Sequence, residues 1–122
     1  MSKPGHLADA ILDGLLARDP ALLRTRLHPR VHLRMLQPGI TVARVGAYPV
    51  AAGWGPGLVE GGEPLDARVL DRSSWRCAGR LGLHIRLAVG SDGRECEQLM
   101  YVDVADGLVH RIDVLASGLL TV

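Results

Sequence analysis

The sequence predicts an α+β fold in which two N-terminal helices precede an antiparallel β-meander. Two observations support this: apolar residues recur at helical spacing over residues 6–18, and four apolar-rich segments joined by short turns follow residue 65. This order is typical of helices packed on one face of an antiparallel sheet. With 122 residues, 48% of them apolar, the chain can bury one core, and we interpret residues 1–122 as a single domain.

The N-terminal part is predicted to contain a second helix and a strand. Asp19 and Pro20 suit the N-cap and first position of a short helix, which His28-Pro29 ends. Apolar and polar residues then alternate over residues 30–36, as in a half-buried strand. Residues 47–54 are predicted as a short helix.

The glycine-rich stretch from residue 53 to residue 64 is predicted as an irregular loop over the surface or a pocket mouth. Four strands follow it, over residues 65–77, 81–89, 94–105 and 108–115. The Asp106-Gly107 dipeptide between the last two is a strong signal for a two-residue hairpin.

Turn lengths predict how these strands pair. A three-residue turn over 78–80 places Trp75 opposite Leu83, and the Asp106-Gly107 turn places Met100 opposite Asp113. The predicted row Asp113, Met100, Leu83 and Trp75 spans roughly 14 Å at about 4.8 Å per strand. We interpret it as the floor of an apolar ligand pocket.

Composition excludes several classes of function. Fourteen basic and thirteen acidic residues leave a net charge of +1, so we expect neither a nucleic-acid nor a membrane partner. No apolar run is long enough to span a membrane and no signal-peptide pattern is present, which favours the cytoplasm. No histidine spacing suits a metal, and no phosphate-binding or dinucleotide motif occurs, so we expect neither a metal nor a cofactor.

Asp113 is the predicted catalytic residue. On an apolar face the pKa of its carboxyl would rise, which suits proton transfer near neutral pH. Arg111, two residues away on the same face, is predicted to polarise a substrate oxygen; Gln98 is the alternative for that role. A structural Arg111–Asp113 ion pair is the competing interpretation.

Further residues are predicted to bind the substrate. Trp75, Leu83 and Met100 would shape the pocket by stacking and sulfur contact, Gln98 would orient a carbonyl or a water, and Trp54 would line a lid. For all of them, ordinary core packing is the alternative.

The stretch E-Q-L-M-Y-V-D-V-A-D-G-L-V-H-R-I-D-V-L-A-S-G, residues 97–118, resembles the last hairpin of the nuclear-transport-factor-2-like superfamily. The two-helix opening and the four-strand meander also match this superfamily, whose SnoaL-like branch includes polyketide cyclases and ketosteroid isomerases. The resemblance implies a cystatin-like fold, a curved antiparallel sheet that forms a cone against the N-terminal helices. It also implies a ligand pocket in the cone and an acidic residue on the last strand, at Asp113.

The chain departs from the specific enzymes of that superfamily. Ketosteroid isomerases carry a tyrosine on the first helix, where this chain has Ile11, Leu12, Leu15 and Leu16. The Arg-x-Asp pair of epoxide hydrolases is missing from residues 81–89 and 94–105. Both specific activities are therefore disfavoured.

Two functions remain open. The first is a bacterial SnoaL-like enzyme that performs cofactor-free acid–base chemistry on a hydrophobic carbonyl or epoxide substrate. The second is a non-catalytic ligand-binding or dimerisation module of the same fold. Leu99, Tyr101 and Ile112 are predicted to form an apolar patch on the outer sheet face, which favours a homodimer interface.

Overall fold

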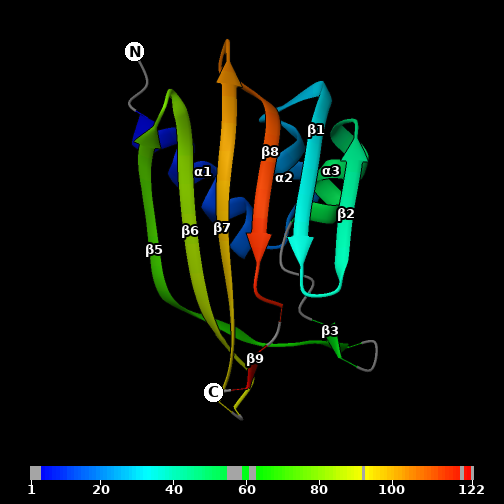
Figure 1. Cartoon of the computed structure of the whole chain (residues 1–122), viewed down its shortest axis with the longest axis vertical. Helices are drawn as coiled ribbons and strands as arrows, with labels where there is room; N and C mark the ends of the chain where they lie inside the picture. The colour runs from blue at the N-terminus through cyan, green and yellow to red at the C-terminus, as the bar shows by residue number, and fades with distance from the viewer. Residues whose placement is uncertain (1–3, 55–58, 61–62, 92, 119, 122) are drawn as a thin grey trace.

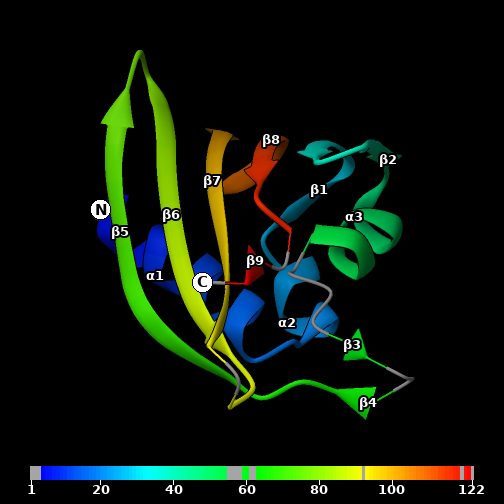
Figure 2. The same ribbon diagram turned by 60° about the horizontal axis from the view of Figure 1, so that its bottom comes forward.

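A long curved sheet forms one side of the molecule, and three helices fill its concave side (Figures 1 and 2). The computed structural model describes residues 4–54, 59–60, 63–91, 93–118 and 120–121. The helices are α1 (Pro4–Leu16), α2 (Pro20–Arg24) and α3 (Ala47–Trp54). The predicted α+β fold, with its curved sheet packed against N-terminal helices, is confirmed.

The helices form where their local sequence signals lie. The buried side chains of α1 are Ala8, Ile11, Leu12 and Leu15, which follow the spacing of one helix face. Helix α2 begins after Asp19, whose carboxylate accepts a hydrogen bond from the Leu22 amide at 3.1 Å. Helix α3 turns its buried side, including Trp54, towards the sheet.

Seven strands form the main sheet. In chain order they are β1 (Leu27–Gln37), β2 (Ile40–Val45), β5 (Ala67–Cys77), β6 (Arg80–Val89), β7 (Arg94–Ala105), β8 (Leu108–Ala116) and the short β9 (Leu120–Thr121). The spatial order is β2-β1-β8-β7-β6-β5, and β9 pairs with β7. Strands β1 and β8 run parallel, and their pairing joins the β1–β2 hairpin to the antiparallel strands β5 to β8. Within the predicted loop, β3 (Val59–Glu60) and β4 (Glu63–Pro64) pair as a hairpin, and the rest of that loop lies partly outside the described residues.

The turn before β6 is shorter than the sequence prediction. Cys77 pairs with Arg80, so Ala78 and Gly79 alone connect the strands, with φ angles of +51° and +79°. Such a turn matches the twist of antiparallel strands. Trp75 consequently lies opposite Gly82, on the outer face of the sheet, and the predicted Trp75–Leu83 pair is wrong.

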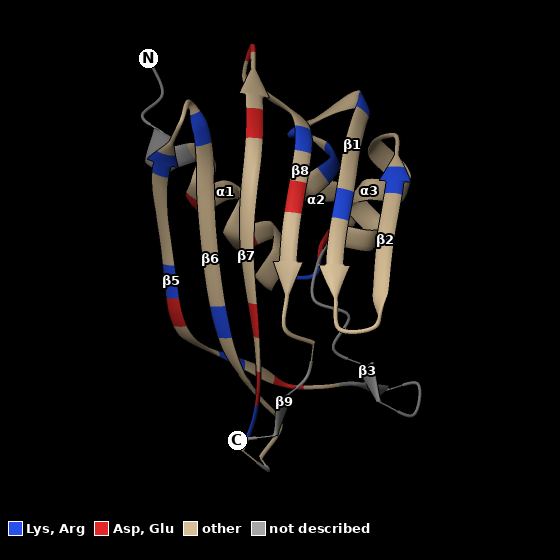
Figure 3. Ribbon diagram, in the orientation of Figure 1, with Lys and Arg blue, Asp and Glu red and all other residues tan. Residues whose placement is uncertain are grey.

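A β-bulge in the last hairpin changes the predicted faces of β8. Val104 pairs with Val109 as predicted, but Asp103 pairs with Arg111, so His110 is an extra residue on β8. Arg111 and Asp113 therefore lie on the outer face. Figure 3 shows one basic and one acidic stretch along β8. Ile112, predicted for the outer face, is instead fully buried.

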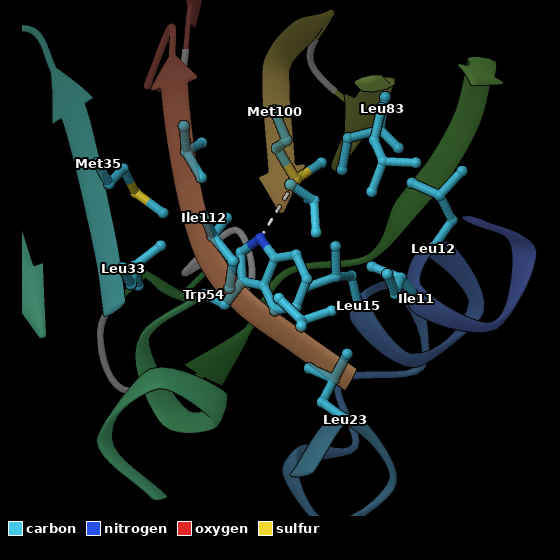
Figure 4. Close-up of a cluster of buried hydrophobic side chains, with 14 of the residues drawn as sticks. Ile11, Leu12, Leu15, Leu23, Leu33, Met35, Trp54, Leu83, Met100 and Ile112 are labelled. Carbon is cyan, nitrogen blue, oxygen red and sulfur yellow. Dashed lines mark hydrogen bonds between the residues drawn. The ribbon is translucent and has the colours of Figure 1, made fainter. Parts of the chain in front are cut away.

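The core lies between the concave sheet face and the helices (Figure 4). Aliphatic side chains dominate it, as expected from a chain without phenylalanine. Trp54 is its largest fully buried side chain. No helix among the described residues has the length and apolar character that crossing a membrane requires.

The close approach of Trp75 to Gly82 yields the first prediction. A Cβ atom at residue 82 would overlap the Trp75 indole. We expect Gly82→Ala to lower the free energy of unfolding by about 1–3 kcal/mol, because the indole must move away. Chemical denaturation measures this loss. In a Trp75→Ala background the same substitution should cost far less, and an undiminished cost would contradict the proposed overlap.

Candidate functional site

The residues predicted to form one site lie on two opposite faces of the sheet. Four of them are buried on the side of the sheet that the helices cover: Leu83, Gln98 and Met100 on the strands, and Trp54 at the end of α3. The other three face outwards: Trp75, Arg111 and Asp113. The predicted row from Asp113 to Trp75 therefore does not exist.

The inner group is held by adjacent strands and the end of α3. Leu83 on β6 pairs with Met100 on β7, and both side chains are fully buried. The indole N–H of Trp54 donates to Met100 Sδ, with 3.2 Å between the two atoms (Figure 4). A thioether is a weak acceptor, so this indole donor is only weakly satisfied. Trp54 lies in the centre of the core, not in a lid.

Gln98 is the one buried polar or charged side chain among the residues that the structure describes. It lies on β7 between Ile85 of β6 and Ala116 of β8, and only 4% of its surface is exposed. Its Oε1 atom has no hydrogen-bond partner. A buried amide oxygen without a partner typically costs about 1–3 kcal/mol.

Acid–base chemistry has little support on the inner face. Cys96, two residues from Gln98, is also buried, and burial raises the pKa of its thiol. The protonated thiol is a poor nucleophile. The described residues contain no cluster of side chains suited to hold a metal ion.

Asp113 belongs to a charged network on the outer face. Its Oδ2 atom accepts hydrogen bonds from Arg80 at 2.8 Å and from Arg111 at 3.2 Å. Arg80 also pairs with Asp103 at 2.5 Å and lies over the Tyr101 ring, 5.9 Å from its centroid. The Arg111–Asp113 ion pair, the competing interpretation of the sequence, is therefore present.

This network sets the protonation of Asp113. Burial raises the pKa of its carboxyl, but the hydrogen bonds and charges of Arg80 and Arg111 lower the pKa by more, so it lies below its ordinary value. Asp113 is therefore an anion at neutral pH and has no proton to donate. The predicted rise of its pKa is wrong, because the carboxylate faces two guanidinium groups instead of hydrocarbon.

Arg80 is not among the predicted site residues, because the predicted turn covers residues 78–80. The signal was present: Ala78-Gly79 precedes a strand in the same way as Asp106-Gly107 does. A two-residue turn makes Arg80 the first residue of β6, from which it reaches Asp103 and Asp113 across the sheet.

The outer face also carries two adjoining grooves. One, of about 350 Å³, is lined by Arg34, Leu36, Tyr101 and Asp113 among others. The second, of about 300 Å³, contains His84 and Glu97, and both grooves share Leu99 and Leu115.

His84 lies between two carboxylates in the second groove. Its Nε2 atom is 2.6 Å from Glu97, and its Nδ1 atom is 3.5 Å from Asp71. These charged and polar groups lie beside Leu99, Leu115, Ala116 and Ser117, which line the rest of the groove.

The lowered pKa of Asp113 predicts how stability depends on pH. Its ion pairs contribute stability above the unfolded value, near 3.8, and this contribution is lost as the pH falls through the lower folded pKa. Between about pH 5 and pH 3 the melting temperature should therefore fall more for the native chain than for Asp113→Asn. Thermal unfolding at several pH values measures these falls in melting temperature. Asp66→Asn, at an exposed aspartate, is the control and should behave as the native chain does. Equal falls in the native chain and Asp113→Asn would contradict it.

Known proteins resemble this chain in structure but not in sequence. No protein-family model and no curated protein sequence matches the chain. A putative polyketide cyclase from Xanthomonas campestris pv. campestris is 13% identical, with a TM-score of 0.67 over 92% of this chain and 88% of that one. A putative ketosteroid isomerase from Kribbella flavida is 17% identical, with a TM-score of 0.64 over 93% and 76%.

A third structure is an NTF2-like protein of unknown function from Cytophaga hutchinsonii. It is 10% identical, with a TM-score of 0.65 over 96% of this chain and 92% of that chain. At these identities the likeness concerns the fold alone, and a shared fold does not imply a shared activity. The chain thus has the nuclear-transport-factor-2-like fold that its last hairpin predicts.

Proposed function

We propose that the chain is a non-catalytic module that binds a small, mainly apolar molecule on the inner side of its sheet. The supporting observation is Gln98, whose buried Oε1 atom has no partner. The molecule would carry a hydroxyl or N–H group that donates to this oxygen. Its apolar part would pack against Trp54, Leu83 and Met100, which are fully buried in the core, so binding would require these side chains to move apart.

The energetics of Gln98 support a binding role. A leucine or methionine of similar size would fill this position without an unsatisfied oxygen. Keeping the amide costs the free protein about 1–3 kcal/mol, which a bound donor would recover. The same polar group would discriminate between molecules that differ by one hydrogen-bond donor, because the Gln98 oxygen stays unpaired when the bound molecule lacks that donor.

Binding is favoured over catalysis because the described inner face offers no side chain suited to move a proton at neutral pH. Its buried titratable group is the Cys96 thiol, whose pKa burial raises. Asp113, the residue on which the acid–base hypothesis depended, lies on the other face as a paired anion.

Replacement of Gln98 tests this proposal. Gln98→Leu should raise the melting temperature of the free protein, because it removes the unpaired acceptor. A bicyclic phenol should stabilise the native chain more than its methyl ether does, and this difference should vanish in Gln98→Leu. Thermal shift measurements provide both values.

Gln37→Leu is the matched control, because Gln37 is a half-buried glutamine at the end of β1 that donates to Met35 Sδ. It should keep the preference for the phenol. A lower melting temperature for Gln98→Leu, together with an unchanged preference for the phenol, would show that Gln98 has a structural role.

The outer face supports a second candidate function, self-association. Leu36 and Leu115 are 42% and 58% exposed, and they adjoin the half-buried Leu99 and Tyr101. Arg34 and Asp113 place charges of both signs beside these apolar groups. A two-fold interface uses the same patch twice and therefore suits a surface that carries both signs. Of the residues predicted for this interface, Leu99 and Tyr101 remain, whereas Ile112 is in the core.

Substitution of this patch tests the dimer. Tyr101→Glu should convert a dimer to a monomer in light scattering, because it places a carboxylate at the centre of the apolar contact. Leu22→Glu, at an exposed leucine of α2, should leave the mass unchanged. A monomeric native chain, or a Tyr101→Glu variant of unchanged mass, would exclude this interface.

A further inference from the structure

We propose that the free edge of β2 binds an extended acidic peptide segment, which adds to the sheet as a further strand. Strand β2 ends the sheet on one side, and the structure describes β1 as its neighbour. The exposed edge of a sheet presents unpaired backbone groups that can pair with another chain. The charge of this edge and the residue composition of β2 support an acidic partner that pairs as a strand.

The charge of the chain is unevenly distributed. Residues 20–59 contain five arginines and no aspartate or glutamate, whereas all thirteen acidic residues lie elsewhere in the sequence. This segment forms α2, β1, β2 and α3, which lie together at one end of the sheet (Figure 1). In Figure 3 the strands β1 and β2 show basic residues and no acidic ones. The net charge of +1 hides this basic end.

The arginines of this end are available to a partner. Arg26, Arg30, Arg34 and Arg44 are exposed, and none has an ion pair among the residues that the structure describes. The fifth, Arg24, stacks on Tyr48 at 4.1 Å from the ring centroid. Guanidinium groups bind carboxylates in a bidentate geometry, and arginine loses less hydration than lysine on pairing.

Arg34 and Arg44 flank the edge from two sides. Arg34 lies on the outer face of β1, opposite Ala43 of β2. Arg44 belongs to β2 itself, and its side chain lies over Gly53 of α3 on the inner side. An added strand would alternate its side chains between the two faces and so bring carboxylates towards both arginines.

The composition of β2 also supports strand addition. Its sequence, Ile40 to Val45, is rich in β-branched residues, and the end residues Ile40 and Val45 are 57% and 59% exposed. Natural proteins usually protect edges with charges, bulges or proline. Here the one charged residue on the strand is Arg44, which a carboxylate would neutralise.

The opposite edge of the sheet is protected. Strand β5 carries charges of both signs and a bulge between Val69 and Asp71. Arg72 binds Asp9 and Asp13 of α1 at 3.2 and 2.9 Å. The contrast indicates that β2, not β5, is the edge that can accept a partner.

Charge also decides between an acidic peptide and a second copy of this chain. Two β2 edges in contact would bring arginine against arginine, and like charges at an interface are unfavourable. Tyr48 is the one exposed tyrosine or tryptophan among the described residues of this end, and Arg24 covers one face of its ring. The series of aromatic side chains on which successive bases of a single-stranded nucleic acid stack is therefore missing there.

The test uses a fluorescein-labelled peptide in which glutamate and valine alternate. Its length of about eight residues is typical of a strand. We expect saturable binding in fluorescence anisotropy, and slower hydrogen exchange at the amides of β2 but not of β5. Two control peptides separate charge from strand formation. A lysine–valine peptide should not bind, and a glutamate–valine peptide interrupted by proline should bind at least about tenfold more weakly.

Matched variants locate the site. Val45→Glu should weaken binding about tenfold by placing a carboxylate on the edge, whereas Val69→Glu, at a 45% exposed valine of β5, should leave it unchanged. The double variant Arg34→Gln/Arg44→Gln should also weaken binding about tenfold. Arg68→Gln on β5 is its control and should leave binding unchanged. Circular dichroism confirms that each variant is folded.

Several outcomes would overturn the proposal. These are no binding of the glutamate–valine peptide at physiological salt, equal binding of the proline-interrupted peptide, or protection of β5 instead of β2. Tighter binding of a single-stranded oligonucleotide, or a native chain that dimerises through β2, would assign the edge to a different partner.

Discussion

The structure depends on one extra residue in β8, His110, which sets the register of the last hairpin. Because of this bulge, Ile112, Val114 and Ala116 face the helices and complete the core. Without it, Arg111 and Asp113 would face hydrocarbon, and burial of charged groups without adequate partners is strongly unfavourable. The ring of His110 instead stacks on His28 with 4.2 Å between ring centroids, which connects the bulge to the start of β1.

Much of the fold could be predicted from local sequence signals. The apolar spacing before residue 17, the Asp19 cap and the alternation in β6 and β7 all correspond to observed elements. Strand β2 was not predicted, although a run rich in β-branched residues between Gly39 and Gly46 is typical of a strand. It has no buried face, since five of its six residues are exposed and the sixth, Val42, is half-buried. Its pairing with β1 depends on the hairpin at Gly39, where φ is +79°.

The site was less predictable than the fold, because a shift of one residue in register moves every following side chain to the other face. The turn at Ala78 and the bulge at His110 each caused such a shift, and together they separated Trp75 and Asp113 from Met100. Gln98 was placed correctly, since no irregularity lies between it and Leu83. Its buried state follows from that strand alone, whereas its unpaired oxygen depends on contacts that no sequence pattern reports.

The uneven distribution of charge has a consequence for how the molecule meets others in solution. Residues 20–59 carry five arginines and no acidic residue, whereas the rest of the chain carries nine basic and thirteen acidic residues, so the molecule has an electric dipole despite its small net charge. Such a dipole biases the orientation of the protein during diffusion, which favours the approach of anionic molecules to the end that carries β1 and β2. This alignment fades with rising ionic strength, since counterions shorten the range of the field to about 8 Å at physiological salt.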